Sequence, residues 1–136
     1  MGEQLHITAL VVSTWSGSEV CEKRIEGEAL TIEMVAAAVT ILDGERRNEV
    51  YLETSGDATL VVAGGPELCF IYATFDSTVF LVPETGREGD PVKLMAGGQI
   101  GIFPPGNLVN RETAAAVAAT WARTGELDAR VSWRET

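Results

Sequence analysis

Histidine and cysteine are scarce in this sequence of 136 residues. His6 is the only histidine, and Cys21 and Cys69 are the only cysteines. The two thiols show no Cys-x-x-Cys spacing and no histidine cluster beside them, which argues against a disulfide framework and against a zinc site. We therefore expect no metal and no cofactor. We expect both thiols to be reduced and Cys69 to be a core residue, because free cysteine is usually buried.

Recognisable catalytic motifs are also missing. The sequence has no nucleophile elbow, no His-Glu-x-x-His motif and no phosphate-binding loop. His6 lies in an alternating stretch, which favours a structural or exposed role over general-base chemistry. We expect no enzymatic activity. An enzyme acting on a small carbohydrate or nucleotide would need two turn carboxylates in one cleft, at least one of them buried.

Long apolar runs and positive charge are in short supply. No apolar stretch reaches the roughly 18 residues of a membrane-spanning helix, and Met1-Gly2-Glu3-Gln4 lacks the basic start of a signal peptide. We therefore expect a cytoplasmic protein that binds no membrane. Ten Lys and Arg against twenty Asp and Glu give a net charge of −10. Such a surface repels phosphate, which argues against direct nucleic-acid binding, and it suits a cationic partner. The alternative is that the acidity serves only solubility.

The length predicts a single domain over residues 1–136. Residues 5–12 alternate with a period of two and predict a first strand, whereas residues 13–27 mix Trp, Ser, Gly and acids and predict a loop. Thr31 predicts the N-cap of a first helix, and Gly44 predicts its end. The apolar stripe of this helix is predicted to pack on a sheet and consists of Ile32, Val35, Val39 and Leu42.

Short alternating runs separated by turn residues predict that sheet. The predicted strands are residues 49–53, 58–63, 68–74, 78–82, 92–95 and 99–103. Short breaks between consecutive strands favour antiparallel neighbours, so we expect a meander. Asn110 predicts the cap of a second helix over residues 111–124, Gly125 predicts its end, and Val131 and Trp133 predict a closing strand. The predicted fold class is α+β, a mostly antiparallel meandering sheet with two helices packed on it.

Six residues are candidates for contacts with a partner. Trp15 lies beside a Ser/Gly loop, and exposed tryptophan is a favoured interface anchor. Five acids lie in or beside predicted turns, where their carboxylates can face a cationic partner. These acids are Glu67, Asp76, Glu84, Glu88 and Asp90. The alternatives are a core position for Trp15 at the end of the first strand and solvated turns for the acids.

Several short motifs follow one another in the second half of the chain, and their order and spacing form a pattern. They are Gly65-Pro66-Glu67-Leu68 before an apolar strand, Phe103-Pro104-Pro105-Gly106-Asn107 before the alanine-rich helix, Trp121 and Thr124-Gly125 in that helix, and Val131-Ser132-Trp133. In this order the chain resembles the immunity proteins of bacterial polymorphic toxin systems, specifically the type-one Imm family found beside deaminase-like toxins. That family has no catalytic residues, so the matched residues are assigned to the fold.

The resemblance implies a small cytoplasmic antidote that binds a cognate toxin domain and blocks its active site, with a nucleic-acid deaminase as the suggested toxin. A toxin that acts on nucleic acid needs a cationic channel, which an acidic inhibitor can occupy. The alternative is a secretion chaperone, because small acidic α+β proteins also sequester effectors before export. A chaperone would hold an unfolded segment instead of a folded domain. The oligomeric state cannot be predicted from the sequence.

Overall fold

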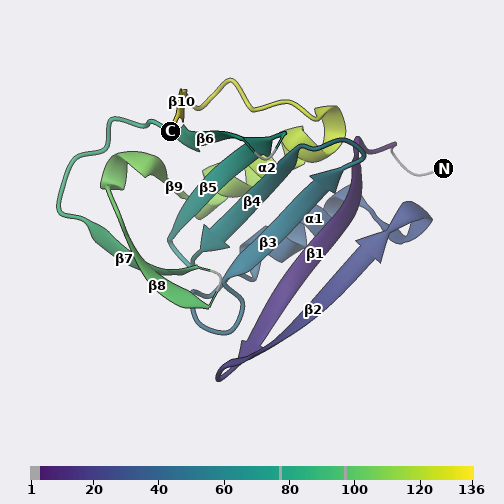
Figure 1. The fold of residues 1–136 in the computed structure, drawn as a ribbon, viewed down its shortest axis with the longest axis horizontal. Coiled ribbons are helices and arrows are strands. Elements are labelled where there is room, and N and C mark those ends of the chain that lie inside the picture. Colours follow the sequence, from purple (N-terminus) through teal and green to yellow (C-terminus); the bar gives the residue numbers. More distant parts are fainter. Residues whose placement is uncertain (1–3, 77, 97) are drawn as a thin grey trace.

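The computed structural model describes residues 4–76, 78–96 and 98–136. These residues form one eight-stranded main sheet and a separate two-stranded sheet (Figure 1). Within the same ranges, two α-helices pack on the main sheet. The predicted α+β class with a mostly antiparallel sheet is confirmed.

The first two strands form a hairpin. β1 (Ile7–Ser16) and β2 (Glu19–Glu26) pair antiparallel along the whole of β2, so the predicted loop over residues 13–27 is wrong. β2 is an edge strand with nearly all of its side chains exposed. It therefore lacks the alternation of apolar and polar residues by which a half-buried strand is recognised. Its charged side chains also protect the free edge from pairing with other chains.

The next four strands form the predicted meander, each pairing antiparallel with the one before it. They are β3 (Glu49–Thr54), β4 (Thr59–Gly64), β5 (Leu68–Phe75) and β6 (Val79–Pro83). β1 extends the sheet beyond β3. The short β10 (Trp133–Glu135) extends it beyond β6, and it starts later than the closing strand that Val131 and Trp133 predict.

The meander does not continue past β6. β7 (Val92–Ala96) and β8 (Gln99–Phe103) pair only with each other among the described strands. A 3-10 turn, η2 (Pro105–Asn107), then leads into β9 (Leu108–Asn110). β9 pairs with the first half of β5 and β6 pairs with its last half, so the two halves of β5 have different neighbours. This split leaves β7 and β8 outside the main sheet as a ribbon.

The first helix, α1 (Ile32–Thr40), follows a 3-10 turn, η1 (Gly27–Ala29), and begins as predicted. The Thr31 side chain caps it by accepting a backbone hydrogen bond at 3.3 Å. The helix ends at Ile41 in a right-handed conformation, so the glycine cap predicted at Gly44 is wrong. The reason is that the Asp43 carboxylate accepts hydrogen bonds from two later backbone amides and organises a separate turn.

The second helix, α2 (Arg111–Thr124), has the predicted boundaries. Oδ1 of Asn110 accepts a hydrogen bond from the Thr113 amide at 2.8 Å. Gly125 takes the left-handed conformation and donates its amide hydrogen to the Trp121 carbonyl at 2.8 Å. Both predicted caps are therefore confirmed.

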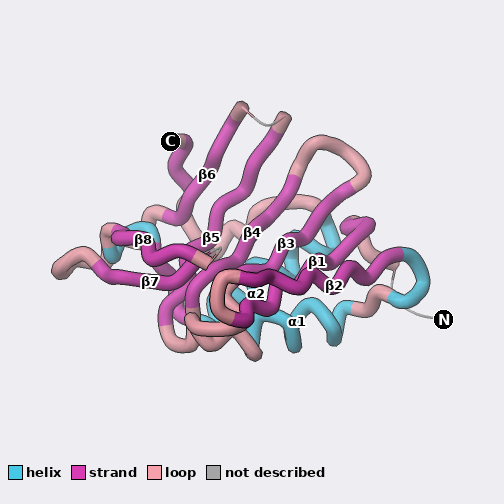
Figure 2. The backbone as a smooth tube through the Cα atoms, turned by 60° about the horizontal axis from the view of Figure 1, so that its bottom comes forward, coloured by secondary structure: helices cyan, strands magenta, loops and turns pink. Residues whose placement is uncertain are grey.

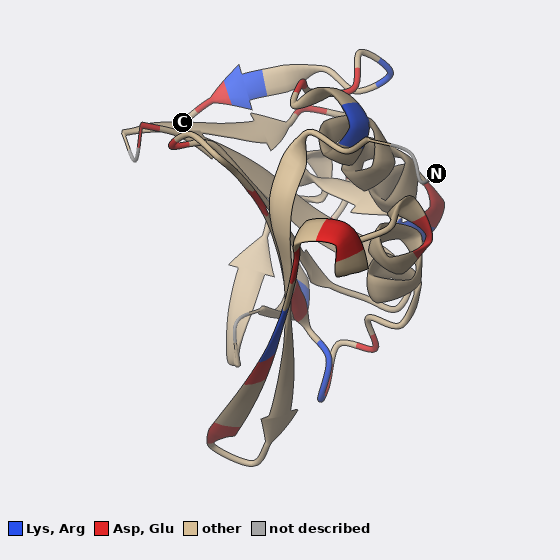
Figure 3. Ribbon diagram, turned by 90° about the vertical axis from the view of Figure 1, so that its right-hand side faces the viewer, with Lys and Arg blue, Asp and Glu red and all other residues tan. Residues whose placement is uncertain are grey.

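Both α-helices cover the same face of the main sheet (Figures 2 and 3). Trp121 of α2 is fully buried against the sheet, with its indole Nε1 donating to the Leu52 carbonyl at 3.2 Å and its ring meeting Phe75 edge-on at a centroid distance of 5.8 Å. Cys69 is a free and fully buried thiol in the same core, as predicted. Burial raises the pKa of this thiol to about 11, so it stays protonated and inert.

The β7–β8 ribbon packs on the opposite face of the main sheet. Cys69 and Ile71 point into the helix core, so Phe70 between them points away from it. There the Phe70 ring contacts the Phe103 ring of β8, with 4.6 Å between the centroids. The ribbon thus adds a third layer at one end of the sheet.

Candidate partner-binding surface

The face of the main sheet opposite the helices is only partly covered by the ribbon. We name the remainder, as far as the structure describes it, the open face. Because side chains alternate along a strand, it is lined by those that point away from the helix core. The charged and aromatic ones, with Thr74 beside them, are Glu22, Arg24 and Glu26 of β2, Glu49, Tyr51 and Glu53 of β3, Tyr72 and Thr74 of β5, and Phe80 of β6. Smaller side chains such as Val11 and Val61 lie between them.

Strand register brings the residues of the open face together from distant parts of the sequence. Val11 lies opposite both Arg24 and Tyr51, and Val61 lies opposite both Tyr51 and Tyr72. These residues form one row across five neighbouring strands. Val11 and Val61 are only 5% and 2% exposed, so they fill the spaces between the larger side chains. The row therefore has an apolar base beneath polar and aromatic groups.

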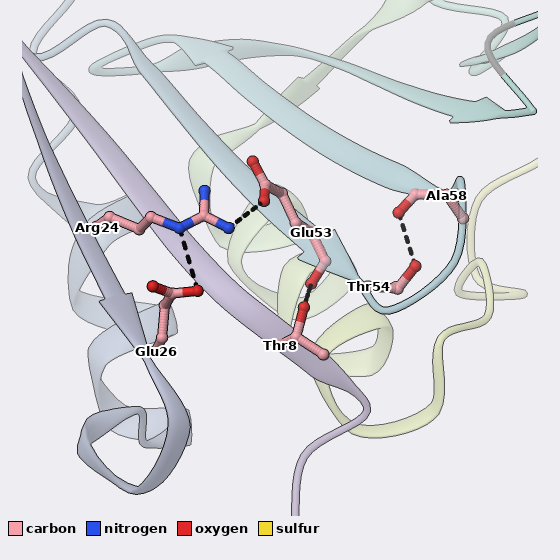
Figure 4. A network of polar contacts seen from close by, with 6 residues as sticks. All are labelled: Thr8, Arg24, Glu26, Glu53, Thr54 and Ala58. Atoms are coloured by element: carbon pink, nitrogen blue, oxygen red, sulfur yellow. Dashed lines mark hydrogen bonds and ion pairs between the residues drawn. The ribbon is translucent and has the colours of Figure 1, made fainter.

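The β2–β3 side of the open face carries carboxylates. Arg24 bridges two of them, with 3.2 Å from its Nε to Oε2 of Glu26 and 2.8 Å from its Nη2 to Oε1 of Glu53 (Figure 4). These two pairs are exposed, so each contributes little to stability. Glu22 and Glu49 lie on the same face. Four carboxylates against one guanidinium leave this side with a net charge of −3.

The β3–β6 side of the open face carries aromatic rings. Tyr72 lies between Phe70 and Phe80, at centroid distances of 5.8 Å and 6.4 Å. Phe80 is 41% exposed. The Tyr51 hydroxyl donates a hydrogen bond to the Glu49 carboxylate. Burial, and then the neighbouring Glu49, raise the pKa of Tyr51 and of Tyr72, so both phenols stay neutral and can donate hydrogen bonds.

The tip of the β7–β8 ribbon rests on Trp15. Gly98 has a φ of +79°, and a Cβ at this position would lie 2.5 Å from the indole ring, so only glycine allows this close packing. The Gly98 amide donates to Oδ1 of the fully buried Asn48 at 3.2 Å. Trp15 is half-buried as a result, and its Nε1 is enclosed without a hydrogen-bond partner in the described part of the chain. Its indole lies beneath the ribbon and not on an open loop.

The five predicted acids are all exposed, and the structure does not gather them at one edge. Glu67 precedes β5 and Asp76 follows it, so nine steps of about 3.3 Å along the strand separate them by about 30 Å. Glu84, Glu88 and Asp90 share the connection from β6 to β7. Three of the five thus lie on one segment and the other two lie at opposite ends of a strand.

Sequence reasoning missed the open face, although one signal for it was visible. Glu49, Tyr51 and Glu53 alternate with the apolar residues Val50 and Leu52 in a predicted strand. Such alternation places two acids and a tyrosine together on the exposed side of a sheet. The other members could not be placed, because their proximity depends on the order and register of strands far apart in the sequence.

Two hollows among the described residues bear on the enzyme alternative. One of about 1020 Å³ lies between Ile7 at the start of β1 and Ile32 at the start of α1. Its lining includes Glu26, Glu28 and Glu33, but all three are exposed, whereas a general acid has to be buried. The other, of about 280 Å³, is lined by Glu84 and by no second carboxylate. It therefore does not supply the pair of acids that a glycosidase-like enzyme would need.

The described ranges also bear on metal binding and on membrane crossing. They contain no group of three or more His, Cys, Asp or Glu side chains placed to hold a metal ion. None of the helices in these ranges is both long enough and apolar enough to cross a membrane.

Comparison with protein families matches residues 25–135 to Imm1, described as immunity protein Imm1. The match begins at the end of β2 and runs through both α-helices, the meander and the ribbon into β10, so it covers well over half of the chain. No curated protein matches the chain. The family match confirms the resemblance of the second half of the sequence and names no toxin. The chain therefore belongs to the Imm1 family of immunity proteins.

Proposed function

We propose that this immunity protein binds the folded catalytic domain of its cognate toxin and blocks access to the toxin's active site. Membership of the Imm1 family supports a toxin as the partner. The protein acts as an inhibitor in the cytoplasm, where the toxin would otherwise reach its target. Inhibition by occlusion needs neither a catalytic group nor a cofactor of its own.

The net charge of −10 is the observation that supports occlusion of a cationic active site. An enzyme that acts on nucleic acid has a positively charged channel for phosphates. Carboxylates of an inhibitor can occupy that channel where phosphates would lie, and opposite charges accelerate the encounter. The proposed toxin is accordingly an enzyme acting on nucleic acid, with a deaminase as the specific candidate.

The six residues predicted from the sequence stay part of this proposal. Glu84, Glu88 and Asp90 are exposed on one segment and add to the negative field that a cationic toxin meets. Trp15 contributes by supporting the ribbon. Glu67 and Asp76 contribute long-range attraction from either end of β5.

The proposed function predicts that a neighbouring gene encodes the cognate toxin domain, and inhibition of that domain tests the proposal. We expect its activity to fall to the background as the immunity protein approaches an equal molar amount, because interfaces of standard size reach affinities of about 1 nM or tighter. The Trp121→Ala variant, which loses the central core side chain, serves as the inactive control. Full toxin activity in a large excess of folded immunity protein would refute the proposal.

Whether the bound toxin is folded or unfolded distinguishes the proposed function from the chaperone alternative. We expect the folded toxin domain alone to be retained by the immobilised immunity protein. Retention of unfolded segments only would support a chaperone and contradict the proposed function.

A further inference from the structure

We infer that the open face is the surface on which the toxin docks, and that its occupant is a cationic surface of the folded toxin domain. The inference rests on the proposed function and names the surface that performs it. Its support comes from the residue types of the open face, its charge, its rigidity and its size.

The aromatic side of the open face is unusual for a solvated sheet. The uncovered face of an antiparallel sheet normally carries polar side chains because water is its only partner. Here Tyr51, Tyr72 and Phe80 lie on that face, with Phe80 41% exposed. Tyrosine is enriched in the energetic centres of protein interfaces, because its ring buries a large apolar area while its hydroxyl keeps a hydrogen bond. Solvation alone therefore does not account for this side.

The charge of the open face identifies its occupant. Glu22, Glu26, Glu49 and Glu53 outnumber Arg24. Burying these carboxylates against an apolar or acidic surface is unfavourable, because they would lose water without gaining a cation. Arg and Lys side chains of a toxin surface supply the cation, and they also stack on tyrosine rings. A cationic patch thus fits both sides of the open face.

The open face is held in one arrangement before a partner arrives. Tyr72 packs between two phenylalanines, Tyr51 is hydrogen-bonded to Glu49, and Arg24 pairs with two glutamates. These side chains stand on strands that are paired on both sides or, at β2, on one side. Binding to such a surface loses little side-chain entropy, which raises affinity.

The open face approaches the size of a standard interface, and β8 extends it. The six strands from β2 to β6 in the sheet order span about 24 Å at a spacing of about 4.8 Å. A standard interface takes about 800 Å² from each partner, roughly a square of 28 Å. On β8, Ile100 and Ile102 point away from the sheet and are 67% and 65% exposed. A toxin domain that covers the open face can also bury these two side chains.

Protection of an introduced thiol tests the position of the toxin. In a Cys21→Ser background, Thr74→Cys places a thiol on the open face and Thr40→Cys places one on the exposed side of α1. Cys69 is buried and does not react. We expect a catalytically inactive form of the neighbouring gene's toxin domain to slow maleimide labelling of the Thr74→Cys variant by about tenfold or more, because the centre of an interface excludes solvent. Labelling of the Thr40→Cys variant should stay unchanged.

A matched pair of charge reversals tests the energetic role of the face. Glu53→Lys changes the open face, and Glu126→Lys makes the same change of charge at an exposed position after α2. We expect Glu53→Lys to raise the dissociation constant by about 30-fold or more, and Glu126→Lys by no more than about threefold. Phe80→Ala, which keeps the charge, should weaken binding by about tenfold. Thermal melting of each variant verifies that it is folded.

The outcomes of these experiments distinguish failure of the inferred docking surface from failure of the proposed function. If the wild-type protein neither binds nor inhibits the toxin domain, the proposed function and the inference both fail. If it binds and inhibits while the Thr74→Cys variant labels at its free rate and Glu53→Lys keeps its affinity, only the inference fails. Equal losses from Glu53→Lys and Glu126→Lys would also overturn the inference, because net charge and not the face would then decide affinity.

Discussion

Asp128 shows how a single polar residue fixes the end of the chain. Its carboxylate is 7% exposed and accepts hydrogen bonds from the Thr120 hydroxyl at 2.7 Å and from the backbone and side chain of Arg130 at 2.9 Å. Its carbonyl accepts a hydrogen bond from Trp133 Nε1 at 3.1 Å. One residue thus ties α2 to β10. Burial by itself would raise the pKa of Asp128, but these hydrogen bonds together outweigh burial and lower it.

The lowered pKa predicts a pH-dependent contribution of Asp128 to stability. A carboxyl group with a folded pKa below its unfolded value stabilises the protein above the unfolded pKa of about 3.9, and this stabilisation is lost as the pH falls through the folded pKa. We expect Asp128→Asn to lower the free energy of unfolding by about 1–3 kcal/mol at pH 7. The difference from wild type should shrink as the pH falls through the folded pKa of Asp128, because its carboxyl group then becomes protonated. Denaturant unfolding at several pH values measures both effects.

An exposed turn acid provides the control for Asp128. Asp57→Asn changes the charge equally but removes no buried hydrogen bond. Its free energy of unfolding should stay close to that of wild type. A constant difference between Asp128→Asn and wild type across the whole pH range would contradict the assigned role.

Residues with local partners were predictable from the sequence, and residues with distant partners were not. Asn110 and Gly125 cap α2 through groups three or four positions away, so their residue types and spacing predict these caps. Asn48 bonds to Gly98, fifty positions along the chain, and nothing near Asn48 in the sequence shows this partner. The open face was not predicted for the same reason, because its residues are distant in the sequence and come together only through strand register.

At the scale of elements, the main difference between the predicted and the observed fold is the position of the β7–β8 ribbon. The strands themselves were predictable from their alternation, since β7 and β8 coincide closely with two predicted runs. Their departure from the meander was not, because it depends on β9 taking the edge of β5. Gly98 and Asn48 then fasten the ribbon tip over Trp15. The ribbon thereby limits the open face at one end.

Asn48→Ala tests how the ribbon is fastened. The variant leaves the Gly98 amide without its partner, so we expect the free energy of unfolding to fall by about 1–3 kcal/mol. We also expect the tryptophan emission to shift to longer wavelength as the ribbon uncovers Trp15, and a Trp15→Phe background should abolish this shift. Gln99→Ala, at an exposed position on β8, is the control that should change neither. An Asn48→Ala variant with wild-type stability and emission would show that the ribbon is held by other contacts.

At the scale of the whole molecule, charge and shape have separate roles. In the account proposed above, the net charge of −10 acts at a distance and governs how often a cationic toxin is met, whereas the open face governs how long the toxin stays bound. The family match supports a toxin as the partner, and the reaction that the toxin catalyses is part of the proposed function. Acids outside the open face, such as Glu84, Glu88 and Asp90, are therefore expected to change the rate of association more than the rate of dissociation.

Association kinetics at increasing salt test this division. We expect the association rate constant to fall by about tenfold or more between 20 mM and 500 mM salt, because ions screen exposed charges beyond roughly 10 Å, while the dissociation rate changes little. Glu84→Gln, Glu88→Gln and Asp90→Asn combined should slow association at low salt and leave dissociation as in wild type. An association rate that is flat with salt would contradict electrostatic steering.

Survival of cells that express the neighbouring gene's toxin domain tests the central claim most directly. The measurement is the number of colonies formed when the toxin domain is induced together with this protein. The account predicts that wild type restores colony numbers to those seen with an inactive toxin, that Glu126→Lys does the same, and that Glu53→Lys combined with Phe80→Ala does not. Continued killing of cells that contain abundant, folded wild-type protein would contradict the account.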